Sequence, residues 1–262
     1  MKLFDTHCHL DDRAYKNDMD AVVSRSHAAG VCAMMTVGTD KQSSQKAVAL
    51  AETISGLFAS VGTHPHDAKD VGKTDLVFMR NLARSHKVKA WGEIGLDFNR
   101  MYSPREIQEH WFVAQLLIAD ELGLPIIFHE RDSGGRLLEL LKKHPNSGRK
   151  GVVHCFSGNE EELKQYLEMG FYIGITGILT LKDRGADLRE FSRSIPQDRL
   201  VVETDAPYLT PAPEKNHTRR NEPAFVRSVM FKLAQVRGDD PETLASTVWE
   251  NSCRLYQIPY SN

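Results

Sequence analysis

Short apolar runs alternate along the chain with longer segments in which apolar residues recur every three or four positions. The short runs are continuous rather than alternating, which is typical of parallel strands covered on both faces. The longer segments have the period of amphipathic helices. We therefore expect strands at residues 2–6, 31–37, 57–61, 88–93, 126–129, 151–155, 171–175 and 200–203.

Helix start signals flank the longer segments. Ser103, which is followed by a proline, predicts a capped helix start. Asn159 is expected to begin another helix, and Asn221 and Asp239 or Asp240 are expected to cap the last two. The predicted helices cover residues 18–29, 43–54, 74–86, 103–122, 132–144, 159–170, 223–237 and 241–255.

Repeated alternation of strand and helix predicts a (β/α)8 barrel with extra C-terminal helices. The 262 residues exceed the usual domain size, but barrels commonly run this long, so we expect one domain over residues 1–262. The longest loops are expected at residues 63–73, 176–184 and 204–222. Each follows a strand, which is the side of such barrels that carries active sites.

Composition narrows the class of protein. No stretch is apolar for long enough to span a membrane, and a net charge of −2 argues against a protein held on nucleic acid by a global positive field. The four cysteines are scattered, as in reduced cytoplasmic proteins. A strand that begins at Lys2 leaves no room for a signal or transit peptide. We expect a cytoplasmic protein, and a monomer.

Metal-ligand residue types follow the predicted strands. His7 and His9 are one residue apart, so they share a face if residues 2–6 begin a strand that continues through them. Alone, they could be ordinary surface histidines. However, Glu93, His129, His154, Glu203 and Asp205 also stand at strand ends. Mixed imidazole and carboxylate ligands suit a pair of Zn or Mn ions, while Mg would need further oxygens from a nucleotide phosphate.

Seven stretches, spread over nearly the whole chain, also resemble those of the TatD family of metal-dependent deoxyribonucleases, which belongs to the amidohydrolase-like hydrolases. The amidohydrolase pattern often uses a carbamylated Lys as a bridge, but no Lys closes strand four or five here. The matching stretches are residues 3–11, 61–66, 92–97, 125–132, 154–158, 202–208 and 219–224.

The resemblance implies a two-metal nuclease of 3′ to 5′ polarity. It assigns Glu93 as the bridge between the ions, places His64 near the scissile phosphate and gives Glu203 a role in supporting the catalytic water. We expect Asp205 to accept the water's proton. Orientation of a ligand histidine is an equally open role for Glu203. The implied metal ligands are His7, His9, Glu93, His129, His154 and Asp205.

Evidence for the substrate is thinner. His64 and His66 follow strand three, and Arg131 and Arg220 follow strands five and eight, where they could bind a phosphate. A solvated turn or a surface salt bridge is the ordinary alternative for each. One or two of the aromatic residues near the strand ends could stack a base. These residues are Phe98, Tyr102, Phe156, Tyr172 and Tyr208.

A duplex would have to fray before it reached a barrel mouth, so we expect an exonuclease that acts on single-stranded DNA, and possibly RNA, ends. Two other functions remain open. The same metals could hydrolyse an ester or amide, as in an aminoacyl-tRNA deacylase. Alternatively, the barrel could be a non-enzyme with structural metals, although structural sites are usually closed.

Overall fold

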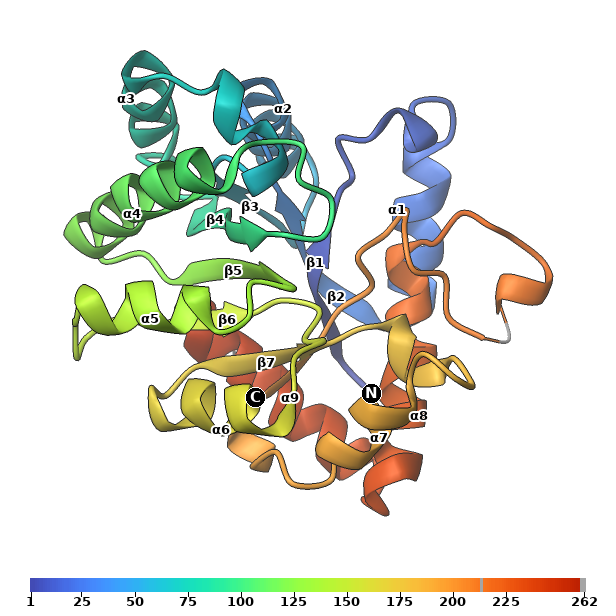
Figure 1. Cartoon of the computed structure of the whole chain (residues 1–262). Helices are drawn as coiled ribbons and strands as arrows, with labels where there is room; N and C mark the ends of the chain where they lie inside the picture. Colours follow the sequence, from blue (N-terminus) through green and yellow to red (C-terminus); the bar gives the residue numbers. More distant parts are fainter. Residues whose placement is uncertain (213, 260–262) are drawn as a thin grey trace.

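Eight parallel strands form one sheet in which each strand pairs with the next along the chain, and the helices lie around it (Figure 1). The computed structural model describes residues 1–212 and 214–259. The strands are β1 (Leu3–Cys8), β2 (Val31–Val37), β3 (Leu57–Val61), β4 (Val88–Asp97), β5 (Ile126–Arg131), β6 (Gly151–Val153), β7 (Tyr172–Ile175) and β8 (Leu200–Val202). This order confirms the predicted (β/α)8 barrel.

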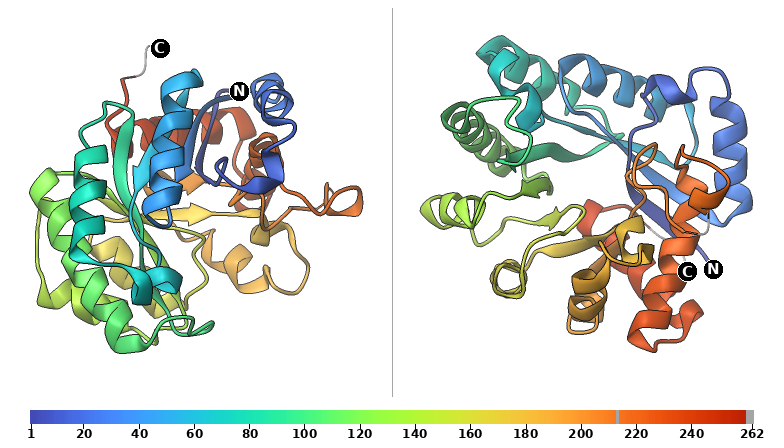
Figure 2. Two further views of the ribbon diagram at one scale, coloured as in Figure 1. Left: turned by 90° about the horizontal axis from the view of Figure 1, so that it is seen from above. Right: turned by 45° about the vertical axis from the view of Figure 1, so that its right-hand side comes forward.

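The helices connect successive strands, and two more follow β8 (Figure 2). Within the described residues, no helix has the length and apolar character required to cross a bilayer. The α-helices are α1 (Met19–Ala28), α2 (Lys41–Thr53), α3 (Lys73–Leu82), α4 (Arg105–Leu122), α5 (Arg136–Lys143), α6 (Glu160–Glu168), α7 (Ala186–Phe191), α8 (Val226–Arg237) and α9 (Pro241–Tyr256). Short 3-10 helices are η1 (Arg13–Tyr15), η2 (Pro65–Asp70), η3 (Gly177–Thr180), η4 (Gln197–Arg199), η5 (Glu214–Asn216) and η6 (Pro223–Phe225).

Two hydrophobic clusters hold the strands in place. The larger one fills the space between the sheet and the helices. The smaller one joins Phe4, Met35 and Ile127 from the strands to Leu255 and Tyr256 at the end of α9. The last helix is therefore part of the barrel's packing.

A buried carboxylate closes the barrel between β1 and β8. Asp5 accepts hydrogen bonds from the backbone N–H of Thr204 at 2.8 Å and from its hydroxyl at 2.6 Å. A parallel bridge joins Cys8 to Ala206. Burial raises the pKa of Asp5 to about 8, against the effect of its hydrogen bonds to Thr204. The seam lies directly beside the segment that carries His7 and Asp205.

Two predicted helix caps are wrong, because the side chains have other partners. Ser103 Oγ donates to the His66 carbonyl at 2.8 Å, and α4 has no side-chain cap. Asn221 Nδ2 donates to the Thr204 and Tyr208 carbonyls. The caps predicted for the other two helices are confirmed at Asn159 and Asp240.

Replacing Asn221 with Ala should lower the free energy of unfolding by about 2–4 kcal/mol, because the buried amide makes three hydrogen bonds to backbone groups. Urea unfolding followed by circular dichroism measures the loss. The matched control is the exposed Asn81 on α3, where the same substitution should change stability by less than about 0.5 kcal/mol. Equal effects at both positions would contradict a structural role for the Asn221 amide.

Candidate metal centre

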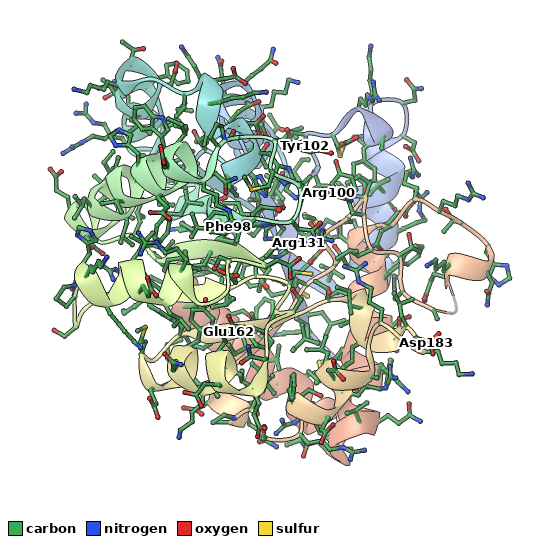
Figure 3. The ribbon with its side chains drawn as sticks, in the orientation of Figure 1. Phe98, Arg100, Tyr102, Arg131, Glu162 and Asp183 are labelled. Atoms are coloured by element: carbon green, nitrogen blue, oxygen red, sulfur yellow. The ribbon has the colours of Figure 1, made fainter. Side chains whose placement is uncertain are left out.

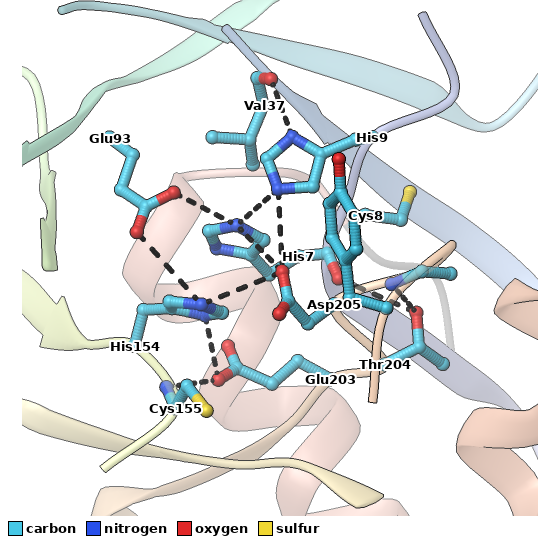
Figure 4. Close-up of polar contacts among 12 residues, drawn as sticks. His7, Cys8, His9, Val37, Glu93, His154, Cys155, Glu203, Thr204 and Asp205 are labelled. Atoms are coloured by element: carbon cyan, nitrogen blue, oxygen red, sulfur yellow. Dashed lines mark hydrogen bonds and ion pairs between the residues drawn. The ribbon is translucent and has the colours of Figure 1, made fainter. Parts of the chain in front are cut away.

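The side chains predicted as metal ligands converge at the C-terminal ends of the strands, and Figure 4 shows them all except His129. His7 Nε2 lies 3.3 Å from His9 Nε2 and 3.3 Å from Glu93 Oε2. Asp205 Oδ1 lies 3.3 Å from His9 Nε2 and 3.8 Å from His154 Nε2. Residues from opposite ends of the chain therefore bring nitrogen and oxygen donors into one small space.

Glu93 lies between two halves of this group. Its Oε2 faces His7, whereas its Oε1 lies 2.6 Å from His129 Nδ1 and 4.0 Å from His154 Nε2. Because the two oxygens face different imidazoles, one carboxylate could serve two ions. This position agrees with the bridging role that the family resemblance implies.

Three of the imidazoles have an acceptor at the nitrogen that points away from the group. His9 Nδ1 lies 3.2 Å from a carbonyl of β2, His129 Nε2 lies 3.3 Å from Asp97 Oδ2, and His154 Nδ1 lies 2.9 Å from Glu203 Oε1. Each acceptor is placed to hold a proton on the outer nitrogen, by a hydrogen bond for His9 and His129 and by an ion-pair contact for His154. The lone pair of the inner nitrogen is then left free to bind a metal.

The charges of the group also fit bound cations. Glu93, Glu203 and Asp205 are largely buried, and within the described residues their ion-pair partners are imidazoles, not Lys or Arg. Burial opposes a charged His154, but Glu203 and then Glu93 raise its pKa to about 10. Uncompensated buried carboxylates are costly. The donor set therefore fits divalent cations.

Glu203 lies behind His154 rather than beside the pocket. One of its oxygens accepts from the Cys155 N–H at 2.5 Å and lies against His154 Nδ1. Its side chain is 1% exposed. Of the two roles that the sequence left open, this geometry supports orientation of His154.

Gly174 on β7 makes room for that carboxylate, since a Cβ there would lie 2.5 Å from Glu203 Oε1. We expect Gly174→Ala to displace Glu203 and weaken metal binding about tenfold or more, as loss of a partner that orients a ligand does. Isothermal titration with Mn2+ measures the change. Gly148→Ala is the control, because a Cβ there meets only Asn146 Oδ1 at 3.4 Å. Unchanged affinity in Gly174→Ala would contradict the role given to Glu203.

His64 reaches the centre of the group, and His66 does not. His64 Nε2 lies 3.1 Å from His129 Nδ1, whereas His66 Nε2 is held 2.6 Å from Asp97 Oδ2. Burial, with the nearby His129, lowers the pKa of His64 well below its usual value. The His66 N–H donates to His64 Nδ1. A neutral His64 therefore carries its proton on Nε2, the nitrogen that lies against His129 Nδ1.

Two glutamines of α4 fix the backbone next to His64 and at Asp97, and sequence reasoning missed both glutamines. Gln115 bonds both backbone groups of Thr63, at 2.7 and 3.0 Å, just before His64. Gln108 does the same for Asp97, at 2.8 and 3.0 Å. Both side chains are 1% exposed. They are buried polar residues on an otherwise apolar helix face, which is the signal that could have revealed them.

The predicted arginines have different surroundings. Arg131 lines a cavity of about 680 Å³ together with His64, His66 and all of the ligand group except His7. Arg220 instead binds both oxygens of Asp18, at 2.8 and 2.7 Å, and also Glu222. It ties the loop after β8 to α1 and does not line the cavity. Arg220, which the sequence predicts at a phosphate, therefore anchors this loop.

The cavity also contains arginines that sequence reasoning did not single out. Arg100 and Arg184 line it with Arg131. Two aromatic residues, Tyr102 and Tyr208, line it as well and are 56% and 53% exposed. Arg100, Tyr102 and Arg131 lie close together over the middle of the barrel in Figure 3. Of the other candidates for stacking, Phe156 and Tyr172 are buried, and Phe98 packs against Arg105.

Comparison with known proteins gives consistent matches over the whole chain. Residues 4–257 match the family described as TatD related DNase. The chain is 40% identical over 257 residues to the 3′-5′ ssDNA/RNA exonuclease TatD of Cronobacter sakazakii, covering 97% of each protein. It is 37% identical over 256 residues to the uncharacterized metal-dependent hydrolase YabD of Bacillus subtilis, covering 98% and 99%. The crystal structure of YjjV, a TatD homolog from Escherichia coli, superposes with a TM-score of 0.91 at 30% identity, covering 98% of each chain.

Proposed function

Because the chain belongs to the family of TatD-related DNases, we propose that it is a metal-dependent exonuclease that hydrolyses single-stranded DNA or RNA from the 3′ end. The observation that carries this proposal is the group of inward-facing imidazole nitrogens around Glu93. Family membership alone does not fix the substrate of this chain, so the pocket must supply the argument for a nucleic acid.

We assign two divalent ions, Mg, Mn or Zn, to this group, with Glu93 shared between them. When bound, such ions polarise phosphoryl oxygens and bring the ionisation of water toward neutral pH. The buried carboxylates supply the opposite charge. The proposed ligands are His7, His9, Glu93, His129, His154 and Asp205.

Asp205 is the proposed general base. Its side chain is 16% exposed, whereas those of Glu93 and Glu203 are 4% and 1% exposed, so it is the carboxylate of the group that a water molecule reaches most easily. His9 and His154 lower its pKa, against the effect of burial, and keep it ionised. An ionised Asp205 can accept a proton from the attacking water.

The pocket has groups suited to the rest of a nucleotide. His64 lines the cavity, and its Nε2 proton, which lies against His129 Nδ1, can donate to a non-bridging phosphate oxygen when that nitrogen binds a metal instead. Arg131 lines the same cavity and can bind a phosphate of the strand. The exposed rings of Tyr102 and Tyr208 can stack bases, which suits a single strand of any sequence. His66, held by Asp97, contributes to the wall.

The same catalytic residues could hydrolyse a carboxylic ester, as in an aminoacyl-tRNA deacylase, but the arginines around the cavity favour a phosphodiester. The proposal includes a cytoplasmic location, on the basis of four free cysteines.

The test supplies Mn2+, Mg2+ or Zn2+ to chelator-treated protein with single-stranded DNA labelled at its 5′ end, and in parallel with an aminoacyl ester. We expect the DNA to shorten stepwise from its 3′ end, only when metal is present. Cleavage of the ester alone would overturn the nuclease assignment in favour of the alternative.

A further inference from the structure

A second hollow adjoins the cavity that contains the ligand group. It has a volume of about 250 Å³ and lies between the loops that follow β5, β6 and β7. Arg131 and Arg184 line both spaces, so they stand on the border between them. None of the proposed metal ligands lines the second hollow.

The two border guanidinium groups are free to bind a ligand. Within residues 1–212 and 214–259, neither Arg131 nor Arg184 forms a side-chain hydrogen bond or an ion pair, whereas Arg136 and Arg220 are each held by two carboxylates. Unpaired guanidinium groups that line the same space are suited to a phosphate, which offers several acceptor oxygens.

Hydrogen bonds from a neighbouring arginine hold the loop that carries Arg184. Arg189 donates to the carbonyls of Leu179, Leu181 and Lys182, at 3.0, 2.6 and 2.5 Å. The N–H of Gly185 also donates to the Leu181 carbonyl, at 3.2 Å. Because the backbone on both sides of Arg184 is bonded, a ligand would meet a guanidinium group whose attachment is already ordered.

The hollow itself has an apolar floor and a polar rim. Phe156, Ile178 and Leu188 form the floor and are 2%, 3% and 5% exposed. Asp132 and Asp187 stand at the rim with Ser157. A nucleobase has this combination of flat apolar faces and polar edges, and carboxylates accept from the amino groups of bases. Pockets for drug-sized ligands occupy roughly 300–1,000 Å³, so a hollow of this size suits one base.

We propose that this hollow binds the base of the penultimate nucleotide, and that Arg131 and Arg184 bind the phosphate on its 5′ side. The inference rests on the proposed exonuclease function. A strand cleaved at its 3′-terminal nucleotide has no phosphate beyond that nucleotide, so a second phosphate lies only on the 5′ side. The substrate is therefore an oligonucleotide with at least two bound phosphates, rather than an isolated phosphodiester.

A dinucleotide tests the phosphate contact, with and without a 5′-phosphate. The wild-type protein should show a KM about tenfold lower for the phosphorylated form at similar kcat, because the added contact lies away from the reacting atoms. Arg184→Ala should remove that preference. The control is Arg84→Ala, which removes one exposed charge outside both spaces and should keep the preference. A preference that survives in Arg184→Ala, or is absent from the wild type, would overturn the proposal.

A blocking substitution tests the base contact. Ser157→Trp at the exposed rim should fill the hollow and raise the KM for a trinucleotide about tenfold. An abasic residue at the penultimate position should raise the KM of the wild type by a similar factor and have little further effect in Ser157→Trp. Additive effects would show that the base lies elsewhere.

Bis(p-nitrophenyl) phosphate separates this inference from the proposed function, since it is a diester without a second phosphate. The Ser157→Trp variant, whose altered residue lines the second hollow and not the cavity of the ligand group, should hydrolyse it as the wild type does. If the wild type hydrolyses this diester and oligonucleotides but ignores the 5′-phosphate, only the subsite is wrong. If the wild type cleaves no phosphodiester at all, the proposed function itself is wrong.

Discussion

Replacing Asp205 with Asn should lower kcat for single-stranded DNA by about a hundredfold to ten-thousandfold, because the substitution removes the proton acceptor and keeps the shape of the side chain. Asp205 is the most open carboxylate of the ligand group and lies 3.3 Å from His9 Nε2. Single-turnover hydrolysis of an end-labelled strand at saturating Mn2+ measures the effect.

Asp20→Asn is the control, because this exposed carboxylate on α1 lies outside the pocket. It should leave the rate unchanged. The unfolding temperature of both variants should show that the fold is retained. Nucleotide release at the wild-type rate by Asp205→Asn would contradict the role of Asp205 as general base.

Adding Mn2+ to chelator-treated protein should raise the unfolding temperature by about 5–10 °C for each site that is filled. The ions relieve repulsion among buried carboxylates that have no Lys or Arg partner within the described residues. A ligand at a hundred times its Kd stabilises the folded state by about 2.7 kcal/mol at one site, and a kilocalorie raises the melting temperature of a chain near this size by about 2–4 °C.

Differential scanning fluorimetry over a series of Mn2+ concentrations measures that rise. Glu93→Gln should reduce it strongly, since the shared carboxylate is lost, whereas Glu121→Gln on the exposed face of α4 should not. An unfolding temperature that is independent of Mn2+ would be evidence against a metal centre formed by these residues.

Much of the fold and the ligand group could be predicted from sequence, for a simple geometric reason. In a barrel of parallel strands, every strand ends at the same rim, so metal-ligand residues at strand ends converge even when they are as far apart as His7 and Asp205. The predicted strand limits differ from those of the structure. β4 extends to Asp97 rather than ending at Glu93.

Asp97 shows what sequence periodicity can predict about this site and what it cannot. It stands four residues after Glu93 on one strand, so the two side chains share a face. That spacing could have marked Asp97 as a partner of His129. Its contacts with His66 and His129 still depend on how β3, β4 and β5 lie side by side, which periodicity does not give.

Other features could not have been predicted, because they depend on partners that are distant in sequence. Arg220 was expected at a phosphate because it follows β8, but Asp18 and Glu222 bind it instead. Arg184 gave no signal in the sequence, yet its side chain has no hydrogen bond or ion pair within the described residues and borders both spaces. The short helix α7 beside it was also missed, since six residues give too little periodicity to detect.

The most direct test of the account counts the metal ions that each chain binds. Native mass spectrometry of Mn2+-loaded protein should find two ions per chain in the wild type, and fewer in Glu93→Ala and in His154→Ala. Two ions retained by both variants, or a wild type that binds none, would contradict the claim that these side chains form a shared two-metal centre.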